Sequence, residues 1–81
     1  MGMLRVLSQR GDDTVTWNSE KAEQGDPEAV AAVREAERIF AETRARGGTA
    51  YVVGRERPPV QIEQFDPQAD QIVMVPRVIG G

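Results

Sequence analysis

The 81-residue chain contains no cysteine and no histidine, and Lys21 is its only lysine. Without thiols and imidazoles it has no cysteine nucleophile, no histidine general base and no zinc-finger site. Any catalysis would therefore rest on carboxylates and hydroxyls. These absences argue against a self-contained enzyme, and we expect the chain to hold no metal and no cofactor of its own.

Charge and hydropathy argue against two further classes of protein. Ten lysines and arginines stand against thirteen aspartates and glutamates, a formal net charge of -3, whereas nucleic-acid-binding domains normally carry a strongly basic patch. No stretch approaches the roughly 18 consecutive apolar residues of a membrane span, and residues 1–13 lack the apolar region of a signal peptide. We expect no nucleic-acid partner, no membrane partner and a cytoplasmic location.

A β-hairpin is predicted at the start of the chain. Residues 3–7 and 14–18 are apolar, β-branched or aromatic at most positions and flank a polar stretch that contains Gly11, which is the pattern of two strands around a turn. Because side chains alternate between the two faces of a strand, one face of the hairpin carries the residues expected to point inward. These are Leu4, Val6, Val15 and Trp17.

One long helix is predicted after a polar loop over residues 18–25. Asp26 suits the N-cap, where its side-chain oxygen would accept from a free amide, and Pro27 suits the first helical position. Over residues 27–46 apolar residues recur every three or four positions, so they would form one stripe facing a core. The two glycines that follow would end the helix. The stripe consists of Ala29, Val33, Ala36, Phe40 and Thr43, flanked by Val30 and Ile39.

Two strands and a turn are predicted next. Residues 49–53 are mostly β-branched or aromatic, and residues 60–65 alternate apolar and polar side chains, with Val60 and Ile62 expected to point inward. The prolines between the two strands cannot lie in a central strand. Residues 66–70 have the Asp-Pro composition of a capped turn.

The last predicted strand, residues 72–75, is apolar at every position, which is typical of a strand in the middle of a sheet and buried on both faces. It would most simply lie beside the first strand and parallel to it, with the helix across one face. The sequence therefore predicts an α+β protein with a mixed four- to five-stranded sheet and one helix, the arrangement of a β-grasp domain. We expect a single domain over residues 1–76 and a flexible tail over residues 77–81.

The sequence ends in two glycines, Gly80 and Gly81. A segment without Cβ atoms is narrow and can adopt φ values that are closed to other residues. It can therefore enter a narrow channel of another protein, where its terminal carboxylate can be adenylated and passed to a sulfur or nitrogen nucleophile. The reacting group would be the carboxylate of Gly81, and the folded body would need no nucleophile of its own, in agreement with the missing cysteine and histidine.

This C-terminal segment resembles the ends of the ubiquitin-like sulfur carriers, which include the small subunit of molybdopterin synthase and the sulfur carrier of thiamine biosynthesis. In that family an aspartate precedes an apolar strand, and the chain ends in a pattern like Pro-Pro-Val-x-Gly-Gly. Arg77 stands where the second proline is usual, and an arginine close to the diglycine is similar to ubiquitin itself. The matching residues are Asp70, Ile72, Val73, Met74, Val75, Pro76, Val78, Gly80 and Gly81.

The resemblance implies a role for each residue of the segment. Gly81 would be the activated glycine and Gly80 its required neighbour. The partner would be a ubiquitin-activating-type adenylating enzyme, which consumes ATP and grips Pro76, Arg77, Val78 and Ile79. A sulfur acceptor or a target protein would follow as the second partner. In a modifier that builds lysine-linked chains, Lys21 would be the only internal acceptor.

Other readings stay open. The long helix and the Phe65-Asp66-Pro67 segment depart from the carrier pattern, and a divergent bacterial modifier or a protein of a phage or mobile element would tolerate both. The alternative function is a small structural or interaction module, such as a phage virion or adaptor protein, whose Gly-Gly end is silent. Asp12 and Asp13 could bind a divalent cation, but adjacent carboxylates in a turn more often serve solubility.

Overall fold

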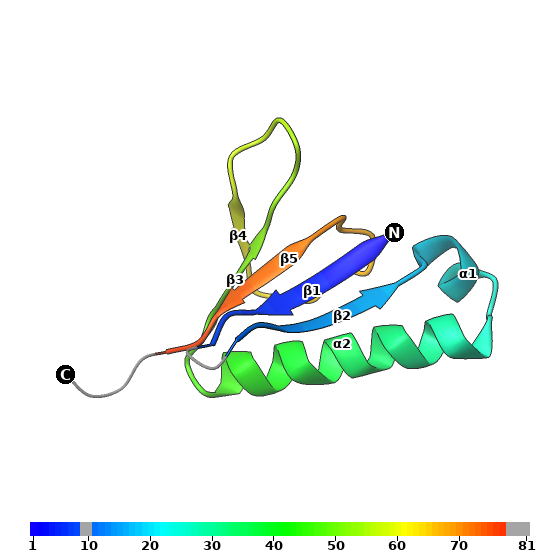
Figure 1. Cartoon of the computed structure of the whole chain (residues 1–81), viewed down its shortest axis with the longest axis horizontal. Helices are drawn as coiled ribbons and strands as arrows, with labels where there is room; N and C mark the ends of the chain where they lie inside the picture. Colours follow the sequence, from blue (N-terminus) through cyan, green and yellow to red (C-terminus); the bar gives the residue numbers. More distant parts are fainter. Residues whose placement is uncertain (9–10, 78–81) are drawn as a thin grey trace.

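The computed structural model describes residues 1–8 and 11–77. Within them, five strands and two helices form an α+β protein, which agrees with the predicted α+β class. Figure 1 shows the long helix lying across the sheet, with the short helix beside its first turn. The elements are β1 (Gly2–Val6), β2 (Asp13–Trp17), α1 (Ser19–Glu23), α2 (Pro27–Ala45), β3 (Thr49–Val52), β4 (Val60–Ile62) and β5 (Ile72–Val75).

The five strands form one mixed sheet in the order β2-β1-β5-β3-β4. β1 is antiparallel to β2 and parallel to β5, with Leu4 opposite Ile72. β3 is antiparallel to both β5 and β4, with Ala50 opposite Met74. The prediction that the last strand lies in the middle of the sheet, beside the first strand and parallel to it, is confirmed.

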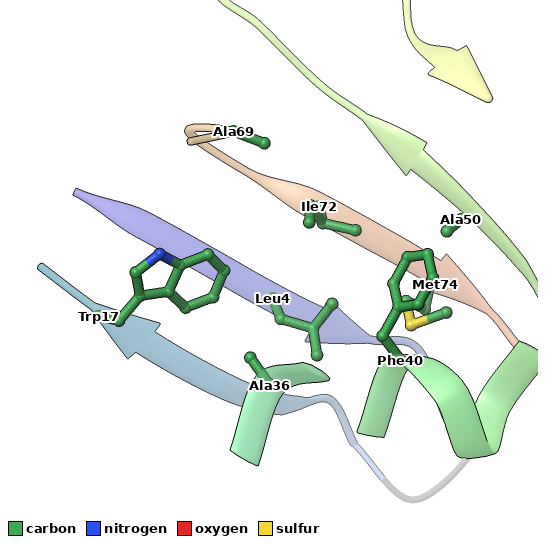
Figure 2. Close-up of a cluster of buried hydrophobic side chains, with 8 residues drawn as sticks. All are labelled: Leu4, Trp17, Ala36, Phe40, Ala50, Ala69, Ile72 and Met74. Atoms are coloured by element: carbon green, nitrogen blue, oxygen red, sulfur yellow. The ribbon is translucent and has the colours of Figure 1, made fainter. Parts of the chain in front are cut away.

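The main core lies between α2 and one face of the sheet (Figure 2). In the two central strands Leu4, Ile72 and Met74 are at most 1% exposed, and Phe40 from α2 is 4% exposed. The predicted helix stripe is confirmed, because Ala29, Ala36 and Phe40 are buried and the other members are half-buried. The four hairpin residues predicted to point inward also belong to this core or pack against it.

Phe65 completes the core in a way that the sequence did not indicate. Its ring lies between those of Trp17 and Phe40, with centroid distances of 5.5 Å and 5.8 Å. The indole Nε1 of Trp17 donates a hydrogen bond of 3.0 Å to the carbonyl oxygen of Pro67, which holds the segment after β4 against the end of the hairpin. Aromatic pairs in these tilted and edge-on arrangements are favourable beyond the area they bury.

The predicted strand over residues 60–65 is therefore too long. β4 is an edge strand that pairs with β3 only from Val60 to Ile62, because the chain then turns away and carries Phe65 into the core. Val60 was predicted to point inward but is 57% exposed, since nothing in the described part of the chain packs over this edge; Ile62 packs against the core as predicted.

The loop predicted over residues 18–25 contains a helix. The side chain of Asn18 caps α1 by accepting a hydrogen bond of 3.0 Å from the amide of Lys21, and the helix packs against α2. α1 has five residues and no buried one, so it has no apolar period to detect. Asp26 is the N-cap of α2, as predicted, but its side chain makes no capping hydrogen bond. Its own amide instead donates to the carbonyl oxygen of Lys21 at 2.9 Å, which fixes Asp26 to the end of α1.

Only one face of the sheet is covered by helices in the described residues. α2 lies on the core side and α1 packs against α2, so the central strand is not buried on both faces as its composition predicted (Figure 1). On the opposite face Val73 is half-buried and Val75 is 40% exposed. Neither helix combines the length and hydropathy needed to span a membrane.

Replacing Phe40 by alanine tests the orientation of α2. We expect Phe40→Ala to lower the free energy of unfolding by about 3 to 5 kcal/mol, because it removes a buried ring and leaves a cavity. Urea denaturation of the two proteins measures the difference. The control is Arg34→Ala, an exposed position on the same helix, for which a change within about 0.5 kcal/mol is expected. Equal losses in the two variants would contradict the packing of α2.

Candidate functional site

The candidate site is the end of β5, where the chain leaves the middle of the sheet. Val75 still pairs with Thr49 of β3. Pro76 follows, and because proline has no amide hydrogen it cannot extend the ladder of hydrogen bonds. Pro76 is half-buried and Arg77 is exposed. The chain therefore passes from the sheet to the surface over Pro76 and Arg77.

The C-terminal end of α2 meets the end of β5 through a pair of glycines. Gly47 has a φ of 90°, and its amide donates to the carbonyl oxygen of Arg44 at 3.0 Å. The amide of Gly48 donates to the carbonyl oxygen of Thr43 at 2.9 Å. These two bonds and the positive φ are those of a Schellman motif, which satisfies the last carbonyl groups of a helix.

The same two glycines leave room for the departing chain. A Cβ atom at Gly47 would lie 2.9 Å from Cδ of Arg77, and one at Gly48 would lie 3.2 Å from the carbonyl oxygen of Val75. Arg77 therefore lies over the glycine turn with its stem in contact with it. Arg44 donates a hydrogen bond of 3.3 Å to the carbonyl oxygen of Gly48, which adds a second guanidinium to this corner.

Of the segment predicted to be gripped by a partner, Pro76 and Arg77 lie in this corner. The other predicted members, Val78, Ile79, Gly80 and Gly81, lie outside the described residues. The boundary between a domain over residues 1–76 and a tail over residues 77–81 stays a prediction, because only Arg77 of that tail is among the described residues.

Lys21, the predicted acceptor, is exposed on α1. Figure 1 shows α1 at the opposite end of the molecule from the end of β5. Its side-chain amine is thus far from the candidate site of its own chain. An attachment to Lys21 would have to come from another molecule.

The other predicted candidates are dispersed. Trp17 is 2% exposed and belongs to the core, as predicted from its position on the same face of the strand as Val15. Nε of Arg5 lies 3.9 Å from Oδ2 of Asp12, a contact that uses one carboxylate of the Asp12–Asp13 pair. In the part of the chain that the structure describes, no group of three or more acidic side chains has a geometry that could hold a metal ion.

A charged row on the outer face of α2 is the strongest electrostatic feature of the described residues. Arg38 pairs with Glu35 and with Glu42, the latter at 2.8 Å between Nη1 and Oε1. The hydrogen bond from Arg38 holds the pKa of Glu35 below its usual range, and the two carboxylates raise the pKa of Arg38. All three groups face solvent, so we regard the row as a solvated helix surface rather than a site.

Two surface features were not foreseen from the sequence. An apolar hollow of about 290 Å³ lies between α1, α2 and the turn after β4, and its apolar lining includes Ala22, Val30, Val33 and Pro67. It could not be foreseen because α1 carries no apolar pattern. The second feature is the sheet face opposite α2, here called the open face. Its central members are Met3, Arg5, Leu7, Tyr51, Val73 and Val75.

The chain was compared with protein-family models, with curated proteins and with solved structures, and none of the three comparisons gave a match.

Replacing Gly47 by alanine tests the contact between the end of α2 and Arg77. A positive φ costs an alanine roughly 1 to 2 kcal/mol, and at Gly47 the new methyl group also meets the Arg77 side chain. The matched control is Gly25→Ala, because Gly25 has a similar φ of 86° and open space around it. We expect Gly47→Ala to destabilise the protein more than Gly25→Ala in urea denaturation.

The excess cost should disappear when Arg77 is also replaced by alanine, because the methyl group then has room. An excess that persists in the Gly47→Ala/Arg77→Ala double variant would contradict the proposed contact.

Proposed function

We propose that the protein is a ubiquitin-like β-grasp carrier or modifier, whose Gly81 carboxylate is adenylated by an activating enzyme and then carries sulfur or is conjugated to a target. The observation that carries the proposal is the strand order, with a parallel pair of β1 and β5 in the centre. A hairpin, a crossover helix and such a central pair are what the β-grasp arrangement requires. The resemblance of the C-terminal segment to the sulfur carriers supports the same reading.

The end of β5 supports the proposal because it suits a reactive tail. The chain leaves the sheet at Pro76, and four residues separate Arg77 from the carboxylate of Gly81. An extended chain gains at most about 3.3 to 3.6 Å per residue, so Gly81 can reach roughly 13 to 14 Å beyond Arg77 into a partner. The reactive carboxylate is that of Gly81, whether translation ends there or processing exposes it.

The chemistry needs nothing from the folded body. A carboxylate oxygen of Gly81 attacks the α-phosphorus of ATP, and pyrophosphate leaves with the displaced electron pair. The resulting acyl adenylate is then attacked at its carbonyl carbon by a sulfur or nitrogen nucleophile, and AMP leaves. The activating enzyme supplies ATP and its phosphate-binding groups. The nucleophile belongs to the enzyme, to a sulfur donor or to the target protein.

The alternative is a structural or interaction module with a silent Gly-Gly end, such as a virion or adaptor protein of a phage. The open face favours it, because exposed apolar side chains on a sheet commonly mark a protein-binding surface. The two functions differ in what they require: the carrier needs Gly80 and Gly81, and the module does not.

The first test follows the terminal carboxylate directly. The protein is incubated with ATP and the adenylating enzyme of its own organism, and its intact mass is measured. We expect an adenylate, or a thiocarboxylate when a sulfur donor is added, and no such product after deletion of Gly80 and Gly81. The control variant Val60→Thr changes an exposed side chain on the edge strand β4, which does not pair with β5, and should react like the original protein. If the deletion leaves the biological role intact while surface changes abolish it, the alternative function is correct.

The second test separates a carrier from a modifier that forms chains of itself. Because Lys21 is the only lysine, Lys21→Arg should eliminate lysine-linked multiple copies and leave single attachments to targets unchanged. Electrophoresis and mass spectrometry of the conjugates distinguish the two. Chains of lysine-linked copies that persist in the Lys21→Arg variant would contradict the prediction, because this protein would then have no lysine through which its copies could be linked.

A further inference from the structure

The open face has the make-up of a protein interface. Val75 is 40% exposed and Leu7 is 36% exposed, two of the four large apolar side chains in the described residues with this much exposure. The parallel register of β1 and β5, which the hydrogen bond from the Leu7 amide to the Met74 carbonyl extends, brings Leu7 beside Val75. Half-buried Met3, Arg5 and Tyr51 belong to the same face. Methionine, tyrosine and arginine are the residues enriched at protein interfaces.

The central row of the face is continuous across the sheet. Val73 lies opposite Arg5 on one side and opposite Tyr51 on the other. Beyond them the row ends in Thr14 of β2 and Gln61 of β4. Val73 and Tyr51 therefore form the apolar part of the row, with Arg5 and Thr14 on one side and Gln61 on the other. A core of apolar contacts with a polar rim is the usual anatomy of a specific interface.

The charges beside the face point to a second copy of this chain as the occupant. Arg5 and Asp12 are oppositely charged, 3.9 Å apart, and each is 42% exposed. An exposed pair at this distance contributes little to the fold, so both groups stay available to a partner. In a two-fold symmetric contact each copy presents the same surface, and one surface that carries both signs of charge can complement itself.

We propose that the open face is the interface of a symmetric homodimer, in which the apolar strip around Val73 and Val75 packs against its counterpart and Arg5 of each copy faces Asp12 of the other. This inference goes beyond the proposed function and does not depend on Gly81. It leaves α2 and Lys21 outside the interface, because they lie on the other side of the sheet or beyond its far end.

Self-association is measured by sedimentation velocity from about 1 to about 300 µM, a range that covers micromolar dissociation constants. We expect a concentration-dependent dimer. Val75→Lys should weaken it at least about tenfold by placing a charge in the apolar strip. The matched control is Val60→Lys. It makes the same substitution at a more exposed valine on the edge of the sheet and should leave the dimer unchanged. Leu7→Ser provides a second interface variant outside the strand, and circular dichroism checks that all variants are folded.

The charge pairing has its own test. Arg5→Glu and Asp12→Arg should each weaken the dimer, because each one places like charges opposite each other. An equimolar mixture of the two variants should restore association, because in the mixed dimer the two introduced side chains face each other with opposite charges, and the original Arg5 and Asp12 face each other as well. A protein that stays monomeric over the whole concentration range overturns the proposal. So does a dimer that Val75→Lys and Val60→Lys affect equally, or a mixture of folded variants that fails to associate.

Discussion

The parallel pairing of β1 with β5 is the constraint on which the rest of the structure depends. Parallel neighbours cannot be joined by a tight turn, so the chain between them has to cross the sheet. The intervening residues provide that crossing with α2 and then return through β3 and β4. Because β5 ends up in the centre of the sheet, the chain leaves at the middle of one end of the molecule, next to the last turn of α2.

That exit links the core to the candidate site. Ile72 and Met74 point into the core, and two residues after Met74 the chain leaves the sheet at Pro76 and becomes exposed at Arg77. The turn after α2 has to lack side chains at Gly47 and Gly48, because Arg77 and the carbonyl group of Val75 pass close to it. The described part of the chain therefore ends in this corner, and the residues predicted to react follow it in the sequence.

The two faces of the sheet have different surroundings. On one face Trp17 of β2 and Phe40 of α2 both contact the ring of Phe65, and these aromatic contacts stabilise the fold. On the other face the apolar side chains of β5 have no helix over them within the described residues. The apolar composition of the central strand therefore does not require that helices of the described chain cover both of its faces.

The sequence predicted the parts of the fold that have a periodic pattern. The hairpin, the stripe of α2 and the central place of β5 followed from alternation, from three- and four-residue spacing and from a fully apolar strand. α1 could not be predicted, because it is polar and five residues long, and Phe65 could not, because its contacts with Trp17 and Phe40 join distant segments. For the candidate site the sequence indicated Pro76 and Arg77, but the contact between Arg77 and Gly47 depends on tertiary structure alone.

The proposed function requires that the Gly81 carboxylate is activated in the cell, and the chemical state of Gly81 there shows whether this happens. The protein and its conjugates are isolated from the organism that makes them and digested with trypsin, which cleaves after Arg77 and releases residues 78–81 with whatever they carry. The proposed function predicts a thiocarboxylate at Gly81, or Val-Ile-Gly-Gly attached to an amine of another protein. Gly81 found only as a free carboxylate or inside an uncut longer chain, in cells where the protein is active, would contradict it.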